Sequence, residues 1–190
     1  MNLKFIIFIV LFFLFCGCKK ENISGANSKE VIPKEVKYGK TFFDYDQIDY
    51  YSINLGEGKI KELYENQDKS KVDKYKYTVT IDETPETITD LDFLNYMEMI
   101  GYVKKKIDKS KFPQINKIFV EKTASDGYAA ACIPVFRDIL IFKKQEKVIG
   151  IAKICFSCHQ YRIIGTHANK ENFGTNNDYE KLEFILNSIK

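Results

Sequence analysis

The 190-residue sequence predicts an α+β fold, an antiparallel β-sheet with a long C-terminal hairpin, packed by several helices including a C-terminal helix. Two β-rich stretches, Tyr128–Lys144 and Val148–Gly165, flank the polar residues Gln145–Lys147 and predict the hairpin. The segment Asn177–Ile189 repeats apolar residues at helical spacing and predicts a helix that covers the sheet. The apolar face of this helix comprises Tyr179, Leu182, Ile185, Leu186 and Ile189.

Shorter elements are predicted before the hairpin. Residues 50–56 predict a short strand, and residues 58–67 predict a helix because their apolar side chains recur at helical spacing. Residues 74–81 alternate between polar and apolar types, which is typical of a half-buried strand. The polar residues 83–88, which include a proline, end that strand.

Two further helices are predicted in the middle of the chain. Asp90 is placed to cap a helix over residues 91–101, where apolar residues form one stripe and Gly101 supplies the C-terminal stop. Ser110 is placed to cap a second helix over residues 111–122. Together with the hairpin, these segments predict one domain over residues 41–190.

The N-terminus has the pattern of a secretory signal. Lys4 is followed by the eleven apolar residues Phe5–Phe15, a run that is shorter than the roughly 20 residues of a membrane-spanning helix. It matches the apolar core of a signal peptide. We therefore expect residues 1–17 to act as a targeting segment, with an uncleaved N-terminal anchor as the alternative.

The end of the apolar run, Cys16-Gly17-Cys18, resembles a bacterial lipobox. The resemblance implies cleavage before Cys18 and acylation of its sulfur and new N-terminus, palmitate among the acyl chains, so that the protein is a lipoprotein anchored in the membrane. Lys19-Lys20-Glu21 loosely resembles the signals that send some lipoproteins of the Bacteroidota to the outer leaflet. The expected location is the outer membrane or the cell envelope.

Residues 18–40 are polar and show no apolar periodicity, so they predict a flexible tether. Removal of residues 1–17 takes away Lys4 and no acid, which changes 29 basic residues to 28 against 26 acidic residues. This nearly balanced charge indicates no nucleic-acid partner, because nucleic-acid surfaces accumulate basic residues.

The sequence Cys155-Phe156-Ser157-Cys158-His159 has the C-x-x-C-H spacing by which c-type haem is attached. In cytochromes this motif lies on a helical turn, whereas here it lies in a β-rich stretch. In an extended strand, Cys155 and Cys158 point to opposite faces unless a bulge intervenes. His167 is the candidate for a second axial ligand. The sequence therefore favours a structural role for the cysteines over a haem c site.

Three cysteines remain in the mature chain, namely Cys132, Cys155 and Cys158. An odd number in an exported protein indicates one disulfide and a free thiol, or a shared metal. A hairpin that turns at Gln145 places Cys132 opposite Cys158, and a bulge near Pro134 shifts the partner to Cys155. We expect Cys132 to be bridged to one of these two residues.

Two other roles remain open for the cysteines. A tetrahedral zinc site could use Cys132, Cys155 and Cys158 with His159 or His167. Thiol exchange is the second role, although a C-x-x-C pair of the thioredoxin type begins a helix whose dipole favours the thiolate.

The pattern C-x-P-x-x-R-D-x-L-x-F, followed by I-C-F-x-C and D-Y-x-K-L, covers Cys132–Leu182. It resembles a group of small bacterial proteins, many of them predicted lipoproteins. The resemblance implies a module built around Cys132 and the C-F-x-C pair, with no activity attached to it.

No catalytic set is recognisable in the sequence. It contains no glycine-rich phosphate loop, nucleophile elbow or H-E-x-x-H motif. We therefore expect a non-enzymatic binding or interaction module, anchored to the envelope membrane through its N-terminal lipid, with a protein as a candidate partner. The alternative is a redox or zinc protein that acts through the cysteines.

Overall fold

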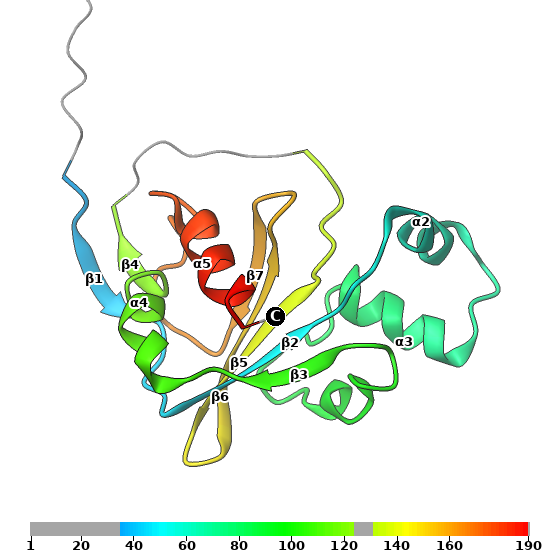
Figure 1. Cartoon of the computed structure of the whole chain (residues 1–190), viewed down its shortest axis with the longest axis horizontal. Coiled ribbons are helices and arrows are strands. Elements are labelled where there is room, and N and C mark those ends of the chain that lie inside the picture. Colours follow the sequence, from blue (N-terminus) through cyan, green and yellow to red (C-terminus); the bar gives the residue numbers. More distant parts are fainter. Residues whose placement is uncertain (1–34, 124–130, 190) are drawn as a thin grey trace, which may run out of the picture. The chain divides into compact units, whose positions relative to one another are not determined.

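The computed structural model describes residues 35–123 and 131–189, and its mixture of helices and antiparallel sheets confirms the α+β prediction (Figure 1). A five-stranded sheet has the order β3-β2-β5-β6-β7, and a two-stranded sheet pairs β1 with β4. The strands are β1 (Tyr38–Thr41), β2 (Gln47–Ser52), β3 (Val103–Lys106), β4 (Val120–Lys122), β5 (Asp138–Lys144), β6 (Lys147–Cys155) and β7 (Gln160–Ile164).

The helices of the described residues lie between and after these strands. They are α2 (Glu57–Glu65), α3 (Lys71–Thr80), α4 (Phe112–Asn116) and α5 (Asp178–Asn187), with short 3₁₀ helices η1 (Asp92–Tyr96) and η2 (Lys109–Lys111). None of the helices in this part of the chain is long and apolar enough to cross a membrane.

Each face of the five-stranded sheet carries its own apolar core. Leu140 and Phe142 point to one face and pack with residues of α4 and α5 and with the aromatic residues beside β1 and β4. Ile139 and Ile141 point to the other face and pack with residues of α2, α3 and η1. Because consecutive strand residues point to opposite faces, the continuous apolar run of β5 is buried on both sides.

The predicted hairpin is formed by β5 and β6. Its two turn residues, Gln145 and Glu146, both have positive φ, as the tight two-residue turn of a β-hairpin requires. The turn is centred between Gln145 and Glu146, half a residue after the predicted centre at Gln145. A bulge after Phe142 shifts the register further, so that Asp138 pairs with Ile154. The predicted pairing register was therefore wrong.

The second arm of the hairpin is shorter than predicted because the chain turns again at Phe156–His159. This turn separates β6 from β7, and Cys155 pairs with Gln160 across it. His159 has a φ of 48°, a conformation that ends an extended strand. The C-x-x-C-H motif thus lies at a hairpin turn and not within a strand.

Residues 74–81 were predicted as a strand, but residues 74–80 belong to α3 and Ile81 follows as its C-cap. Ser70 begins this helix, since its hydroxyl accepts a hydrogen bond from the Asp73 N–H and donates one to the Asp73 carboxylate. Tyr75 stacks on Tyr96 of η1, with the ring centroids 4.1 Å apart. The cap and this contact outweigh the alternating pattern.

The helix predicted over residues 91–101 is the 3₁₀ helix η1 followed by turns. Phe93, Met97 and Ile100 of its apolar stripe are buried, and Leu91 and Leu94 are partly buried. Gly101 ends it with a φ of 104°, but the Asp90 side chain makes no cap. The helix predicted over residues 111–122 is shorter, because α4 ends at Asn116 and the chain continues into β4. The predicted cap is also wrong, since Asp108, and not Ser110, caps the preceding η2.

The C-terminal helix is confirmed as α5, and four of its five predicted apolar residues are buried. The predicted tether, residues 18–40, overlaps β1, which begins at Tyr38. The predicted signal peptide, residues 1–17, and residues 18–34, which include Cys18, lie outside the described residues.

Candidate functional site

The first candidate site is the cysteine cluster at the β6–β7 turn. The structure places the sulfur atoms of Cys132 and Cys158 at disulfide distance, 2.08 Å apart, with 6.1 Å between their Cα atoms. Cys132 is exposed and Cys158 is buried. Cys132 does not lie in β5, so a ladder register is not what brings the two sulfurs together.

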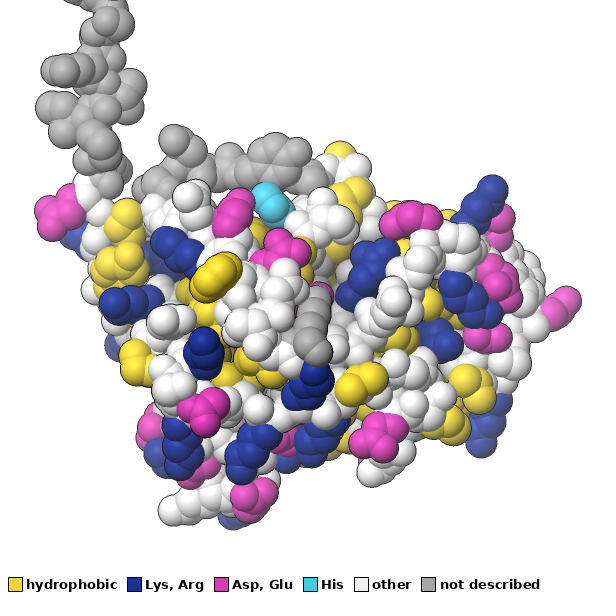
Figure 2. Space-filling view, viewed as in Figure 1, with side chains coloured by type: hydrophobic (Ala, Val, Ile, Leu, Met, Phe, Trp, Pro, Cys, Tyr) yellow, Lys and Arg dark blue, Asp and Glu magenta, His cyan; other side chains and the backbone are white. Residues whose placement is uncertain are grey.

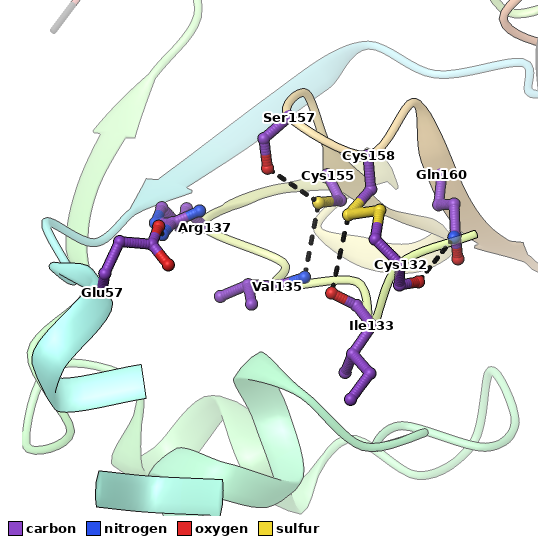
Figure 3. The surroundings of a disulfide bond; sticks show 9 residues. All are labelled: Glu57, Cys132, Ile133, Val135, Arg137, Cys155, Ser157, Cys158 and Gln160. Carbon is purple, nitrogen blue, oxygen red and sulfur yellow. Dashed lines mark hydrogen bonds and ion pairs between the residues drawn. A yellow bond between two sulfur atoms is a disulfide. The ribbon is translucent and has the colours of Figure 1, made fainter. Parts of the chain in front are cut away.

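The segment that carries Cys132 is held in place by hydrogen bonds to several parts of the fold, and Figure 3 shows the bond to Gln160. The Gln160 side chain donates to the Cys132 carbonyl at 2.9 Å, and the Phe136 N–H donates to the Thr80 carbonyl at 2.7 Å. Arg137 donates to the Leu55 carbonyl at 3.0 Å. Since these partners come from several elements, the segment has a fixed course beside the turn.

Cys155 is the third member of the cluster. It is free, only 1% exposed, and packs with Cys158 and Phe136. Its sulfur accepts a hydrogen bond from the Val135 N–H at 3.3 Å and lies 3.5 Å from the Ser157 hydroxyl. The expectation that Cys155 and Cys158 point to opposite faces was wrong, because the turn brings both side chains into one cluster.

The two candidate histidines do not join the sulfurs in a ligand set. The His159 ring stacks on Tyr179 with a centroid distance of 4.7 Å, and His167 lies exposed in the loop after β7. Within residues 35–123 and 131–189, no group of three or more His, Cys, Asp or Glu side chains is placed to hold a metal ion. The geometry thus offers no support for the zinc alternative.

The same residues do not fit covalent haem attachment. That chemistry needs two cysteine sulfurs for thioether bonds and the histidine as an axial ligand. Here the Cys158 sulfur is bound to Cys132, Cys155 is buried, and one ring face of His159 is covered by Tyr179.

A buried lysine next to the cysteine cluster was missed by the sequence analysis. Lys153 is 1% exposed, and its ammonium donates to the carbonyls of Asp82 and Thr84 at 2.8 and 2.7 Å. Its Nζ lies 4.6 Å from the ring centroid of Phe136, the residue that also packs on the cysteines. Burial, followed by the charge of Arg162, lowers the pKa of Lys153 to about 7.

The second candidate site is an apolar groove of about 550 Å³ between β1, α4 and α5. Phe184 and Tyr38 line it and are 78% and 60% exposed, and Ile118 and Ile185 form part of its wall. Figure 2 shows apolar side chains over β1 and α5 on one face, with basic side chains between them. The polar rim comprises Gln114, Lys117, Asn177, Glu180 and Lys181.

Comparison of the chain with protein-family models, with curated proteins and with solved structures finds no match. The function is therefore inferred from the chain's own residues.

Proposed function

We propose that the protein is a lipoprotein of the bacterial cell envelope, anchored through acylated Cys18, and that its folded domain is a non-enzymatic binding module. Its ligand is the anionic surface of the bilayer that holds the anchor. The observation that carries this proposal is Phe184, which is largely exposed at an apolar groove beside β1. Exposed apolar patches on soluble surfaces are typical of interaction sites.

The position of the groove along the chain favours the membrane as its occupant. Tyr38, the first residue of β1, lines the groove, and the chain before it leads back to Cys18. The intervening residues 19–37 span at most about 65 Å when extended. An anchor at Cys18 thus keeps the groove within reach of the bilayer.

The chemistry of the groove matches a lipid surface. Aromatic side chains such as Phe184 and Tyr38 are favoured at the boundary between lipid headgroups and acyl chains. The charged residues at the rim of the groove are two lysines, Lys117 and Lys181, and one acidic residue, Glu180. Each lysine near an anionic surface contributes about 1 kcal/mol of attraction, so the groove binds an anionic bilayer better than a neutral one.

Site-specific photo-crosslinking of the full-length anchored protein tests this proposal. Phe184→benzoylphenylalanine should form adducts with lipid, and the yield should fall in neutral vesicles compared with anionic ones. The matched control is Met99→benzoylphenylalanine, since Met99 is 55% exposed but follows η1, on the other side of the sheet. Adducts of position 184 with a protein, equal lipid adducts at both positions, or none at position 184 would each contradict the proposal.

A further inference from the structure

We propose that Cys155 is the attacking thiol of an internal thiol–disulfide exchange, which moves the bridge from Cys132–Cys158 to Cys155–Cys158 and exposes the Cys132 thiol. The product is a surface thiol able to form mixed disulfides with small disulfides or proteins of the envelope. This activity is independent of the groove and of the lipid anchor.

Geometry is the first support. Cys155 and Cys158 are three residues apart at the hairpin turn that joins β6 to β7, and their side chains belong to one buried cluster (Figure 3). The two side chains are therefore neighbours in the folded chain before the exchange begins.

The surroundings of Cys155 are the second support. The Val135 N–H points at its sulfur at 3.3 Å, so negative charge that forms there on loss of the proton meets a donor. The Ser157 hydroxyl lies 3.5 Å away. Lys153 precedes Cys155 by two residues on β6 and therefore leaves the strand from the same face. The Cys155 sulfur thus faces an N–H group and a hydroxyl within its buried cluster.

The leaving group is the third support. Cys132 is exposed, whereas Cys155 and Cys158 are buried, so a released Cys132 thiolate is stabilised by water. Val135 and Phe136, which follow it, keep separate hydrogen bonds to the Cys155 sulfur and to Thr80. Only the short stretch at Cys132 and Ile133 needs to move away.

The exchange is balanced without an oxidant. The Cys155 proton passes to solvent through the hydroxyl of the exposed Ser157, which lies 3.5 Å from the sulfur. The Cys155 sulfur then attacks the Cys158 sulfur, so that the Cys155–Cys158 bond forms as the Cys132–Cys158 bond breaks. Cys132 leaves with the electron pair and takes a proton from solvent. One disulfide and one thiol are present before and after the step.

Alkylation of the folded full-length chain with N-ethylmaleimide at pH 8, followed by acid quenching and non-reducing peptide mapping, tests the exchange. The chain carries Cys16→Ser and Cys18→Ser, so that only three cysteines remain. We expect label to accumulate on Cys132 together with a linked Cys155–Cys158 peptide. Label on Cys155 with an intact Cys132–Cys158 link, or no label, would overturn the proposal.

Two controls separate the exchange from unfolding. Cys155→Ser should abolish the labelling of Cys132, since no attacking thiol remains. In the parent chain, the rate of Cys132 labelling should not change with urea below the unfolding transition. A labelling rate that rises with the unfolded fraction would place the exchange in the unfolded chain and overturn the proposal. The variant Cys132→Ser gives a third readout. After oxidation with a small disulfide it should contain a Cys155–Cys158 disulfide, and two free thiols would contradict the proposal.

Discussion

Lys153 donates a hydrogen bond of 2.8 Å from its buried amine to the backbone carbonyl of Asp82, which links the C-terminal half of β6 to the loop after α3. This contact holds an ionisable group in an apolar core. A second bond to Thr84 leaves both carbonyls with a donor whether the amine is charged or neutral, because a neutral amine still has two protons.

The stability of the protein should increase with pH because of Lys153. Its pKa is about 7 in the folded state, below the value of about 10.4 of an unfolded chain. Between these values the unfolded state binds more protons, so the free energy of unfolding rises from about pH 7 to pH 10, by an amount on the order of a few kcal/mol. Urea unfolding at several pH values measures this slope.

Lys153→Met should remove that slope and increase stability at pH 7, because a buried charge is replaced by an apolar side chain of similar length. The matched control is Lys147→Met, since Lys147 is exposed on the same strand and its replacement should leave the slope unchanged. An unchanged slope in Lys153→Met would show that another group causes the pH dependence.

Loss of the Cys132–Cys158 bridge should destabilise the domain. The two residues are 26 apart in the sequence, and the entropy of an open loop of that size corresponds to about 3 kcal/mol. We expect Cys132→Ser to lower the free energy of unfolding by about this amount in urea titrations. Cys155→Ser keeps the bridge, so the loss in free energy of unfolding should be clearly smaller. Equal losses in both variants would contradict a bridge between Cys132 and Cys158.

Gly150 and Gly58 should respond in opposite ways to replacement by alanine. A Cβ at Gly150 would lie 2.2 Å from the Phe43 ring, which itself stacks on Phe142 with centroids 4.5 Å apart. Gly150→Ala should therefore cost about 1 to 3 kcal/mol. A Cβ at Gly58 in α2 meets nothing within 4 Å, so Gly58→Ala should stabilise by up to about 1 kcal/mol. Thermal unfolding of both variants checks the pair.

Haem should not attach to the C-x-x-C-H motif. When the protein is expressed with a cytochrome maturation system, we expect no Soret band, because the Cys158 sulfur is bound to Cys132 and the His159 ring is stacked on Tyr179. Covalent haem that survives denaturation would contradict the disulfide assignment.

The elements predicted correctly were those in which the pattern of residues within the element determines whether it is a helix or a strand. The helical spacing of apolar residues in α5 and the long apolar runs of β5 and β6 are each sustained over many residues. In contrast, the alternation over residues 74–81 fits a strand as well as one helix face, and only the Ser70 cap and the contact of Tyr75 with Tyr96 decide the outcome.

The candidate cysteines were predicted from their number and export pattern, but the geometry of their cluster was not. The turn at Phe156–His159 reverses the chain where the sequence still favours a strand, and it places Cys155 and Cys158 on one side. Lys153 was missed because a lysine within an apolar run is usually a surface residue at a strand edge. The groove depends on the relative positions of β1, α4 and α5, which no local pattern encodes.

Metabolic labelling with a fatty acid is the most direct test of the lipoprotein proposal. The wild-type chain and Cys16→Ser should both incorporate the label, because Cys16 precedes the expected cleavage site. Cys18→Ser should incorporate none, because no other cysteine follows the expected cleavage site within the first 100 residues. Labelling of Cys18→Ser at the wild-type level would contradict anchoring through Cys18.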